Sequence, residues 1–151
     1  MSGDVRGDVP SLLFACRKNA GRSVTSKLLA AYYGGDAVRV SSAGSEPGDA
    51  VHAEVAAVLA DLGLDPSTET PMPFDSDGRY SVVVTMGCGE TCPVYAGARY
   101  EDWEIDDPKG QDAATVRRIV ADIDGRVRRL LGELLPGQPL PPSVFEAAAR
   151  G

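Results

Sequence analysis

Apolar and polar positions follow two patterns along the chain, and each pattern predicts one kind of element. Four short runs predict strands, and the first and third are apolar enough to be buried on both faces. These runs cover residues 10–15, 37–42, 81–85 and 99–105. Longer stretches with apolar residues every three or four positions predict helices over residues 23–33, 51–62 and 111–135, with a last helical turn at 144–150. Strands that alternate with helices favour an α/β fold with a parallel sheet covered on both faces.

Segments without periodicity divide the chain into three parts. Residues 1–9 are polar and contain two glycines, which predicts a loose leader. Residues 136–151 form a proline-rich tail. Between them, residues 10–135 hold the whole predicted sheet and make one domain, which is large enough for an ordinary hydrophobic core.

Composition and charge narrow the classes of function. With 43% hydrophobic and 25% charged residues, the chain is typical of a soluble globular protein. No apolar run approaches the roughly 20 residues that cross a bilayer, and the N-terminus lacks a secretory signal. We therefore expect a cytoplasmic protein with no membrane partner, whose three cysteines are reduced. A net charge of −7 argues against nucleic acid as a partner, so an anionic ligand needs a local cluster of donors.

The loop after the first predicted strand has the composition of an anion site. It reads Cys16, Arg17, Lys18, Asn19, Ala20, Gly21, Arg22 and Ser23, where the first helix begins. Ligands of parallel α/β sheets bind at the carboxyl ends of strands, where Cys16 is expected to lie. A loop that closes on a helix N-terminus directs several backbone N–H groups into one concavity, which suits a tetrahedral oxyanion. The segment therefore predicts an oxyanion-binding loop around a sulfur.

Individual side chains of this loop fit the same chemistry. Gly21 permits a close approach of the backbone, and Asn19 tolerates a left-handed conformation in which its amide could brace the loop. Arg22 can offer two donors to two oxygens of an anion. The same donors favour the thiolate of Cys16, a nucleophile, and Ser23 could donate a hydrogen bond to that thiolate when it leaves. The alternative is a buried structural cysteine followed by an ordinary helix cap and a solvated basic turn.

Two acidic residues offer the proton that such chemistry needs. Asp106 and Asp107 precede Pro108, which biases the backbone of Asp107 towards an extended form. When a thiolate attacks a tetrahedral oxyanion, the expelled oxygen leaves better if a carboxylic acid protonates it. The alternative is a solvated pair of acids before a helix, and the spacing alone favours neither interpretation.

The other two cysteines follow the third predicted strand. Cys88 and Cys92 are therefore expected at the same edge of the sheet as Cys16, either as resolving thiols, as inert buried thiols or as part of a metal site. Zinc needs a fuller ligand set, and His52 is the only histidine, so we expect no metal. His52 opens the second predicted helix, where an exposed or capping role is the simplest interpretation.

Three segments and the last long helix resemble a known family. The segments are "LLFACRKNAGRS", "SSAGSEPGDAVHAEV" and "VVVTMGCGETCPVYAGARYEDWEIDDPKGQD". From about residue 10 to 135 the chain is similar to arsenate reductases built on the low-molecular-weight protein tyrosine phosphatase fold. The resemblance implies a three-layer α/β/α architecture with a four-stranded parallel sheet. It also implies that Cys16 is the nucleophile, that Asn19, Arg22 and Ser23 belong to the anion loop, and that Asp107 is the acid.

The resemblance further implies how a covalent intermediate on Cys16 is resolved. In an arsenate reductase a second thiol attacks the nucleophilic sulfur, expels arsenite and leaves a disulfide. Here the hypothesis is that Cys88 attacks Cys16, that Cys92 then attacks Cys88, and that thioredoxin reduces the Cys88–Cys92 disulfide. The alternative reductant is mycothiol with a glutaredoxin-like protein, and no bound cofactor is expected. There are two alternative functions. One is a phosphatase that forms a phosphocysteine on Cys16, and the other is an idle module that binds a phosphate-like oxyanion.

Overall fold

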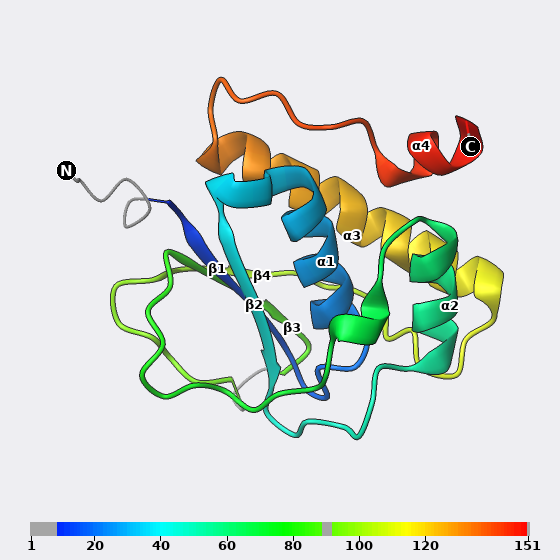
Figure 1. The fold of residues 1–151 in the computed structure, drawn as a ribbon. Coiled ribbons are helices and arrows are strands. Elements are labelled where there is room, and N and C mark those ends of the chain that lie inside the picture. The colour runs from blue at the N-terminus through cyan, green and yellow to red at the C-terminus, as the bar shows by residue number, and fades with distance from the viewer. Residues whose placement is uncertain (1–8, 89–91, 151) are drawn as a thin grey trace.

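A four-stranded parallel sheet forms the centre of the computed structural model, which describes residues 9–88 and 92–150. The strands are β1 (Ser11–Cys16), β2 (Arg39–Gly44), β3 (Val82–Met86) and β4 (Arg99–Asp102), in the order β2-β1-β3-β4 (Figure 1). The prediction of an α/β fold around a four-stranded parallel sheet is confirmed. The second strand lies two residues further along than predicted, because Gly35–Ala37 forms the short 3₁₀-helix η2 before it. Residues 1–8 of the predicted leader and residue 151 lie outside the described residues.

Four α-helices follow in the predicted order. They are α1 (Arg22–Gly34), α2 (Ala53–Asp61), α3 (Ala113–Leu134) and α4 (Val144–Arg150), and the 3₁₀-helix η3 spans Pro66–Thr68. Each predicted helix is confirmed to within two residues at either end. The Asp112 side chain accepts a hydrogen bond from the Thr115 N–H at 2.8 Å and so caps the start of α3. None of the helices in the described ranges has both the length and the apolar content needed to cross a membrane.

The two faces of the sheet are covered in different ways. Alternate residues of a strand point to opposite faces. On one face, Leu12, Phe14 and Cys16 of β1 join the main core, to which all four α-helices contribute. On the other face, Leu13 packs with Val83 under side chains from loops, namely Phe74, Tyr80, Tyr95 and Ala98. The sheet is covered on both faces, as predicted, with helices on one face and loops on the other. The connection from β2 to β3 has to pass β1, and beyond η3 it does so as irregular chain.

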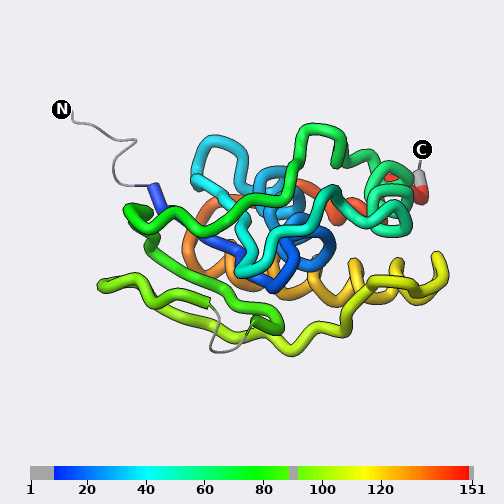
Figure 2. Tube along the Cα trace, turned by 90° about the horizontal axis from the view of Figure 1, so that it is seen from below, coloured from blue at the N-terminus to red at the C-terminus, as the bar shows by residue number. Residues whose placement is uncertain are grey.

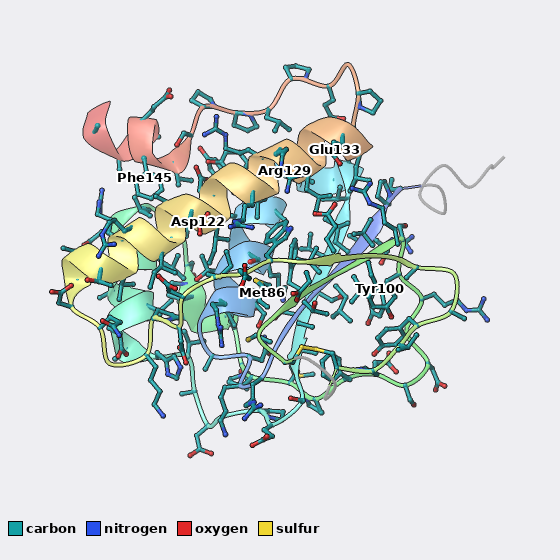
Figure 3. The ribbon with its side chains drawn as sticks, turned by 180° about the vertical axis from the view of Figure 1, so that it is seen from behind. Met86, Tyr100, Asp122, Arg129, Glu133 and Phe145 are labelled. Atoms are coloured by element: carbon teal, nitrogen blue, oxygen red, sulfur yellow. A yellow bond between two sulfur atoms is a disulfide. The ribbon has the colours of Figure 1, made fainter. Side chains whose placement is uncertain are left out.

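The C-terminal tail packs on the core through a buried polar contact. The Tyr33 hydroxyl of α1 donates to Asp124 Oδ1 of α3 at 2.6 Å and accepts from the Val144 N–H of α4 at 2.9 Å. The exposed fractions of Tyr33, Asp124 and Val144 are 2%, 3% and 1%. Phe145 lies beside α3 (Figure 3), where the Arg117 guanidinium carbon is 5.4 Å from the centre of its ring. One tyrosine hydroxyl therefore joins α1, α3 and α4.

Replacing Tyr33 with phenylalanine should destabilise the protein by about 1–3 kcal/mol, because Asp124 and the Val144 N–H lose their shared partner. Burial, followed by the hydrogen bond to Asp124, raises the pKa of Tyr33 from 10.0 to about 12. Above pH 10 the unfolded chain loses this proton while the folded chain keeps it, so the free energy of unfolding falls until about pH 12. Urea denaturation at about pH 9 and about pH 11 should show a smaller fall for Y33F than for the wild type. An equal fall in the free energy of unfolding of both proteins would contradict the raised pKa of Tyr33.

Candidate active site

The carboxyl ends of three parallel strands bring the predicted site together. In the register of the sheet, Cys16 pairs with Gly44 of β2 and with Met86 of β3. The loops that follow β1, β2 and β3 therefore start next to one another, as the view from below shows (Figure 2). Cys16 is a free thiol with an exposed fraction of 3%. We call residues 16–23 the anion loop and residues 45–52, which follow β2, the bracing segment.

The bracing segment fixes the orientation of the anion loop backbone. Four of its N–H groups donate to carbonyls of the anion loop: Ser45 to Cys16 (3.3 Å), Glu46 to Arg17 (2.7 Å), Gly48 to Lys18 (2.9 Å) and His52 to Ala20 (2.8 Å). In a trans peptide, a carbonyl and the next N–H point in opposite directions. Carbonyls held towards the bracing segment therefore turn the following N–H groups towards the concave side. No hydrogen bond joins the N–H of Lys18, Asn19 or Gly21 to another residue in the described ranges, which leaves a nest for an anion.

Gly44 allows the two loops to approach this closely. A Cβ at Gly44 would lie 2.6 Å from the Arg17 carbonyl oxygen and 2.9 Å from the Asn19 nitrogen, and neither backbone atom can move without opening the anion loop. Glycine in a strand often marks a close approach of another backbone. That signal is present in the sequence, but it does not tell which segment approaches, so the sequence alone does not identify Gly44 as part of the site.

A chain of buried hydrogen bonds leads from the backbone to the sulfur. Asn19 has a left-handed backbone, with φ of 51°, and its side chain is fully buried. Its Oδ1 accepts from the Met72 N–H at 2.9 Å, and its Nδ2 donates to Ser23 Oγ at 2.7 Å. Ser23 Oγ lies 2.9 Å from Cys16 Sγ. Since Asn19 already donates to Ser23 Oγ, the serine proton is free to point at the sulfur, and a thiolate there accepts it.

Arg22 connects the anion loop to the loops after β3 and β4. Its side chain has an exposed fraction of 15%, and its Nη1 donates to the Ile105 carbonyl at 3.1 Å. Its Nη2 lies 4.0 Å from Asp107 Oδ2. The guanidinium packs on Gly87, where φ is 87° and a Cβ would lie 2.7 Å from Arg22 Nη1. A glycine at position 87 is therefore required for this placement of the guanidinium.

We call residues 103–112, which follow β4 and carry Asp107, the acid loop, and hydrogen bonds within the loop and from α2 hold it in place. Asp107 Oδ1 accepts from the Lys109 N–H at 3.0 Å, and the Asp107 side chain has an exposed fraction of 58%. Glu54 Oε2 of α2 accepts from the Gly110 N–H at 2.7 Å. Hydrogen bonds from its own N–H and from Gly110 lower the pKa of Glu54 below its ordinary value, so this tether is a carboxylate at neutral pH. Asp106 lines a neighbouring hollow, beside Trp103 and Glu104.

These contacts enclose a pocket of about 290 Å³ in which most of the predicted residues meet. It is lined by Cys16, Arg17, Lys18, Ala20, Gly21, Arg22, His52, Gly87, Asp107 and Lys109. Asn19 and Ser23 are fully buried and do not line the pocket. They are connected to it through the contact between Ser23 Oγ and Cys16 Sγ. Three lining residues, His52, Gly87 and Lys109, were not predicted, because they reach the pocket only through the packing of separate loops. Among the described residues, no group of three or more His, Cys, Asp or Glu side chains is arranged to hold a metal ion.

The other two cysteines form a disulfide near the same edge of the sheet (Figure 3). The Cα atoms of Cys88 and Cys92 are 5.5 Å apart. Cys88 has an exposed fraction of 2%, and its Sγ lies 3.9 Å from the carbonyl oxygen of Ala15, the residue before Cys16. Cys92 is half-buried. The expectation of three reduced cysteines is therefore wrong for this pair: the structure combines one free thiol in the pocket with one disulfide beside the strand that carries that thiol.

Comparison with known proteins decides the family. The family model described as low molecular weight phosphotyrosine protein phosphatase matches residues 11–138. The chain belongs to this family. Among similar family members, a "putative arsenate reductase" of Halobacterium salinarum is 37% identical over 82% of this chain and 92% of its own length. A "glutaredoxin arsenate reductase" of Synechocystis is 30% identical over 82% of this chain and 97% of its own length.

Solved structures agree with this family membership. A thioredoxin-dependent arsenate reductase of Corynebacterium glutamicum is 39% identical, with a TM-score of 0.75 over 86% of this chain. The match spans only 64% of that longer protein. An arsenate reductase described in its phosphate-binding state is 28% identical, with a TM-score of 0.73 over 83% of this chain and 99% of its own length.

Replacing Ser23 with alanine should slow alkylation of Cys16 by iodoacetamide at neutral pH by about tenfold or more, because a hydrogen bond to a charged group is lost. With the Cys88–Cys92 disulfide intact, Cys16 is the one cysteine that can react, so the mass of the protein reports it directly. The matched control is Ser26→Ala, which removes a buried hydroxyl of the same helix that donates to the Arg22 carbonyl. Equal alkylation rates in both variants and the wild type would show that Ser23 does not stabilise the thiolate.

Proposed function

We propose that this protein reduces arsenate to arsenite, with Cys16 as the nucleophile and Cys88 and Cys92 as the thiols that resolve the intermediate. The observation that carries the proposal is the free Cys16 thiol in a nest of N–H groups, next to a Cys88–Cys92 disulfide. The similarity to arsenate reductases over more than four fifths of the chain supports it.

In the first step the Cys16 thiolate attacks arsenic and forms an S–As bond. One hydroxyl group of hydrogen arsenate leaves as water after it takes a proton from Asp107, which lines the same pocket. Anion-loop N–H groups and the Arg22 guanidinium bind the remaining oxygens and stabilise the negative charge on them. Ser23 donates to the sulfur whenever it carries charge. Anion binding by residues 17–23 and proton donation by Asp107 are parts of this proposal.

In the second step the Cys88 thiolate attacks Cys16 Sγ. The S–As bond breaks, and its electron pair stays on arsenic, so arsenic(V) becomes arsenic(III) and leaves as arsenite. The two sulfurs are oxidised to a Cys16–Cys88 disulfide. In the third step the Cys92 thiolate attacks Cys88 Sγ, and Cys16 leaves as a thiolate. The product of this third step has a free Cys16 and a Cys88–Cys92 disulfide, as the structure has.

A further cycle needs two electrons from an external thiol reductant. We propose a thioredoxin-type protein, since the C. glutamicum relative is described as thioredoxin-dependent. A glutaredoxin-type route, including one with mycothiol, is the alternative, because the Synechocystis relative is described as a glutaredoxin arsenate reductase. The half-buried Cys92 is the more accessible sulfur of the pair, so we expect the reductant to attack there.

A phosphatase is the second candidate, because the family and the first chemical step are shared. In that case water would attack a phosphocysteine on Cys16, and the disulfide would have no role in turnover. Asp107 and Pro108 are followed by Lys109 and Gly110, so no aromatic side chain directly follows the acid to hold a phenol ring. We therefore expect hydrolysis of an aryl phosphate to be slow.

The wild type supplied with thioredoxin and its reductase should produce arsenite through many turnovers, whereas Cys92→Ser should stop after one arsenite per protein. The reason is that the variant is trapped as a Cys16–Cys88 disulfide, which mass spectrometry of peptides identifies. Cys16→Ser is the control and should produce no arsenite. Continued cycling of C92S would refute this order of attack. Fast aryl phosphate hydrolysis without arsenite would favour the phosphatase, and silence in both assays would favour an idle anion-binding module.

A further inference from the structure

His52 is the residue of the pocket wall for which the sequence indicated no chemical role. It occupies the N-cap position of α2, where a capping side chain would bond to the first turn of the helix. Its side chain makes no such bond. The side chain instead lines the pocket together with Cys16, Arg22 and Asp107.

The structural tasks of residue 52 are performed by its backbone. The His52 N–H donates to the Ala20 carbonyl at 2.8 Å, and the His52 carbonyl accepts from the Ala56 N–H at 2.9 Å as α2 begins. Any amino acid except proline can make both bonds. The imidazole is therefore not needed to brace the anion loop or to start the helix.

The imidazole lies directly against the anion loop. Its Cδ2 carbon is 3.3 Å from the point that a Cβ on Gly21 would occupy, and Pro108 Cγ is 3.0 Å from the same point. The ring and the proline of the acid loop thus both lie against the backbone of the anion loop at Gly21. Gly21 has no side chain to separate the ring from the loop.

In the part of the chain that the structure describes, no hydrogen bond or ion pair joins the ring nitrogens of His52 to another residue, although the ring interacts electrostatically with Glu54. An imidazole carries at least one N–H in either protonation state, so His52 always has a donor to offer. Among the residues that line the pocket, four cations (Arg17, Lys18, Arg22 and Lys109) outnumber the one carboxylate, that of Asp107. A donor without a partner, in a half-buried position within a positive pocket, suits an anionic ligand.

We propose that His52 is a substrate-binding residue, whose ring N–H donates to an oxygen of the oxyanion held in the anion loop. A tetrahedral oxyanion such as phosphate or arsenate has four oxygens, and a guanidinium that binds in a bidentate way contacts two of them. His52 extends the contacts of the anion from the loop after β1 to the first turn of α2. This inference rests on the proposed function for the identity of the anion.

Two substitutions separate donation from packing. His52→Ala removes the ring, and His52→Phe keeps a ring against Gly21 but has no N–H. Both keep the backbone N–H that binds Ala20. If His52 donates to the anion, both variants should raise the Kd for inorganic phosphate, measured by calorimetry, by about tenfold or more, because a hydrogen bond to a charged group is lost. The KM for arsenate should rise by a similar factor, with kcat within about twofold of the wild type, since the reacting groups are untouched.

Two outcomes would overturn the inference. Wild-type affinity for phosphate in both variants would show that the ring does not contact the anion. Wild-type affinity in H52F with weakened affinity in H52A would show that the ring only fills space. Failure of the proposed function gives a different result. The wild type would bind phosphate and both variants would bind it more weakly, but the wild type would not reduce arsenate.

Discussion

The site depends on the hydrogen bonds by which the bracing segment holds four carbonyls of the anion loop. Each bond fixes a peptide plane, so the N–H groups converge before any anion is bound. A loop without this support would have to become ordered on binding, at a cost of about 1–2 kcal/mol per residue. Gly44 makes the close approach possible, because any side chain there would meet the Arg17 carbonyl. The nest of N–H groups at this site therefore originates in the contact between two loops, at the ends of neighbouring strands.

The same principle extends to the charged groups. Arg22 is held by the Ile105 carbonyl and the surface of Gly87, and Glu54 holds the acid loop at Gly110. Cys16, Arg22 and Asp107 thus belong to loops whose relative positions the sheet edge determines. The chain has a net charge of −7, yet four cationic side chains line the pocket. Local placement, rather than overall charge, decides that an anion can bind at this edge of the sheet.

The sequence predicted the elements and the chemistry that lie within one segment. A buried apolar run that stops at Cys16, followed by a basic loop and a helix, carries its own information. The roles of Gly44, Gly87 and His52 depend on which loops meet in the fold, and local sequence patterns carry no information about those contacts. The docking of the tail has the same cause, since Tyr33 and Asp124 come from two helices that are far apart in sequence. No helix covers the second face, because the part of the β2–β3 connection beyond η3 is too poor in periodic apolar residues to form one.

Amide hydrogen exchange tests most directly whether the anion loop is organised before the anion binds. In the protein without phosphate, the backbone N–H groups of Ser45, Glu46, Gly48 and His52 should already be protected from exchange, because they donate to the anion loop. Adding phosphate should protect the N–H groups of residues 17–22 and change those of the bracing segment little. If the bracing N–H groups exchange freely until phosphate is added, the anion itself organises the loop, and the bracing segment does not preform the site.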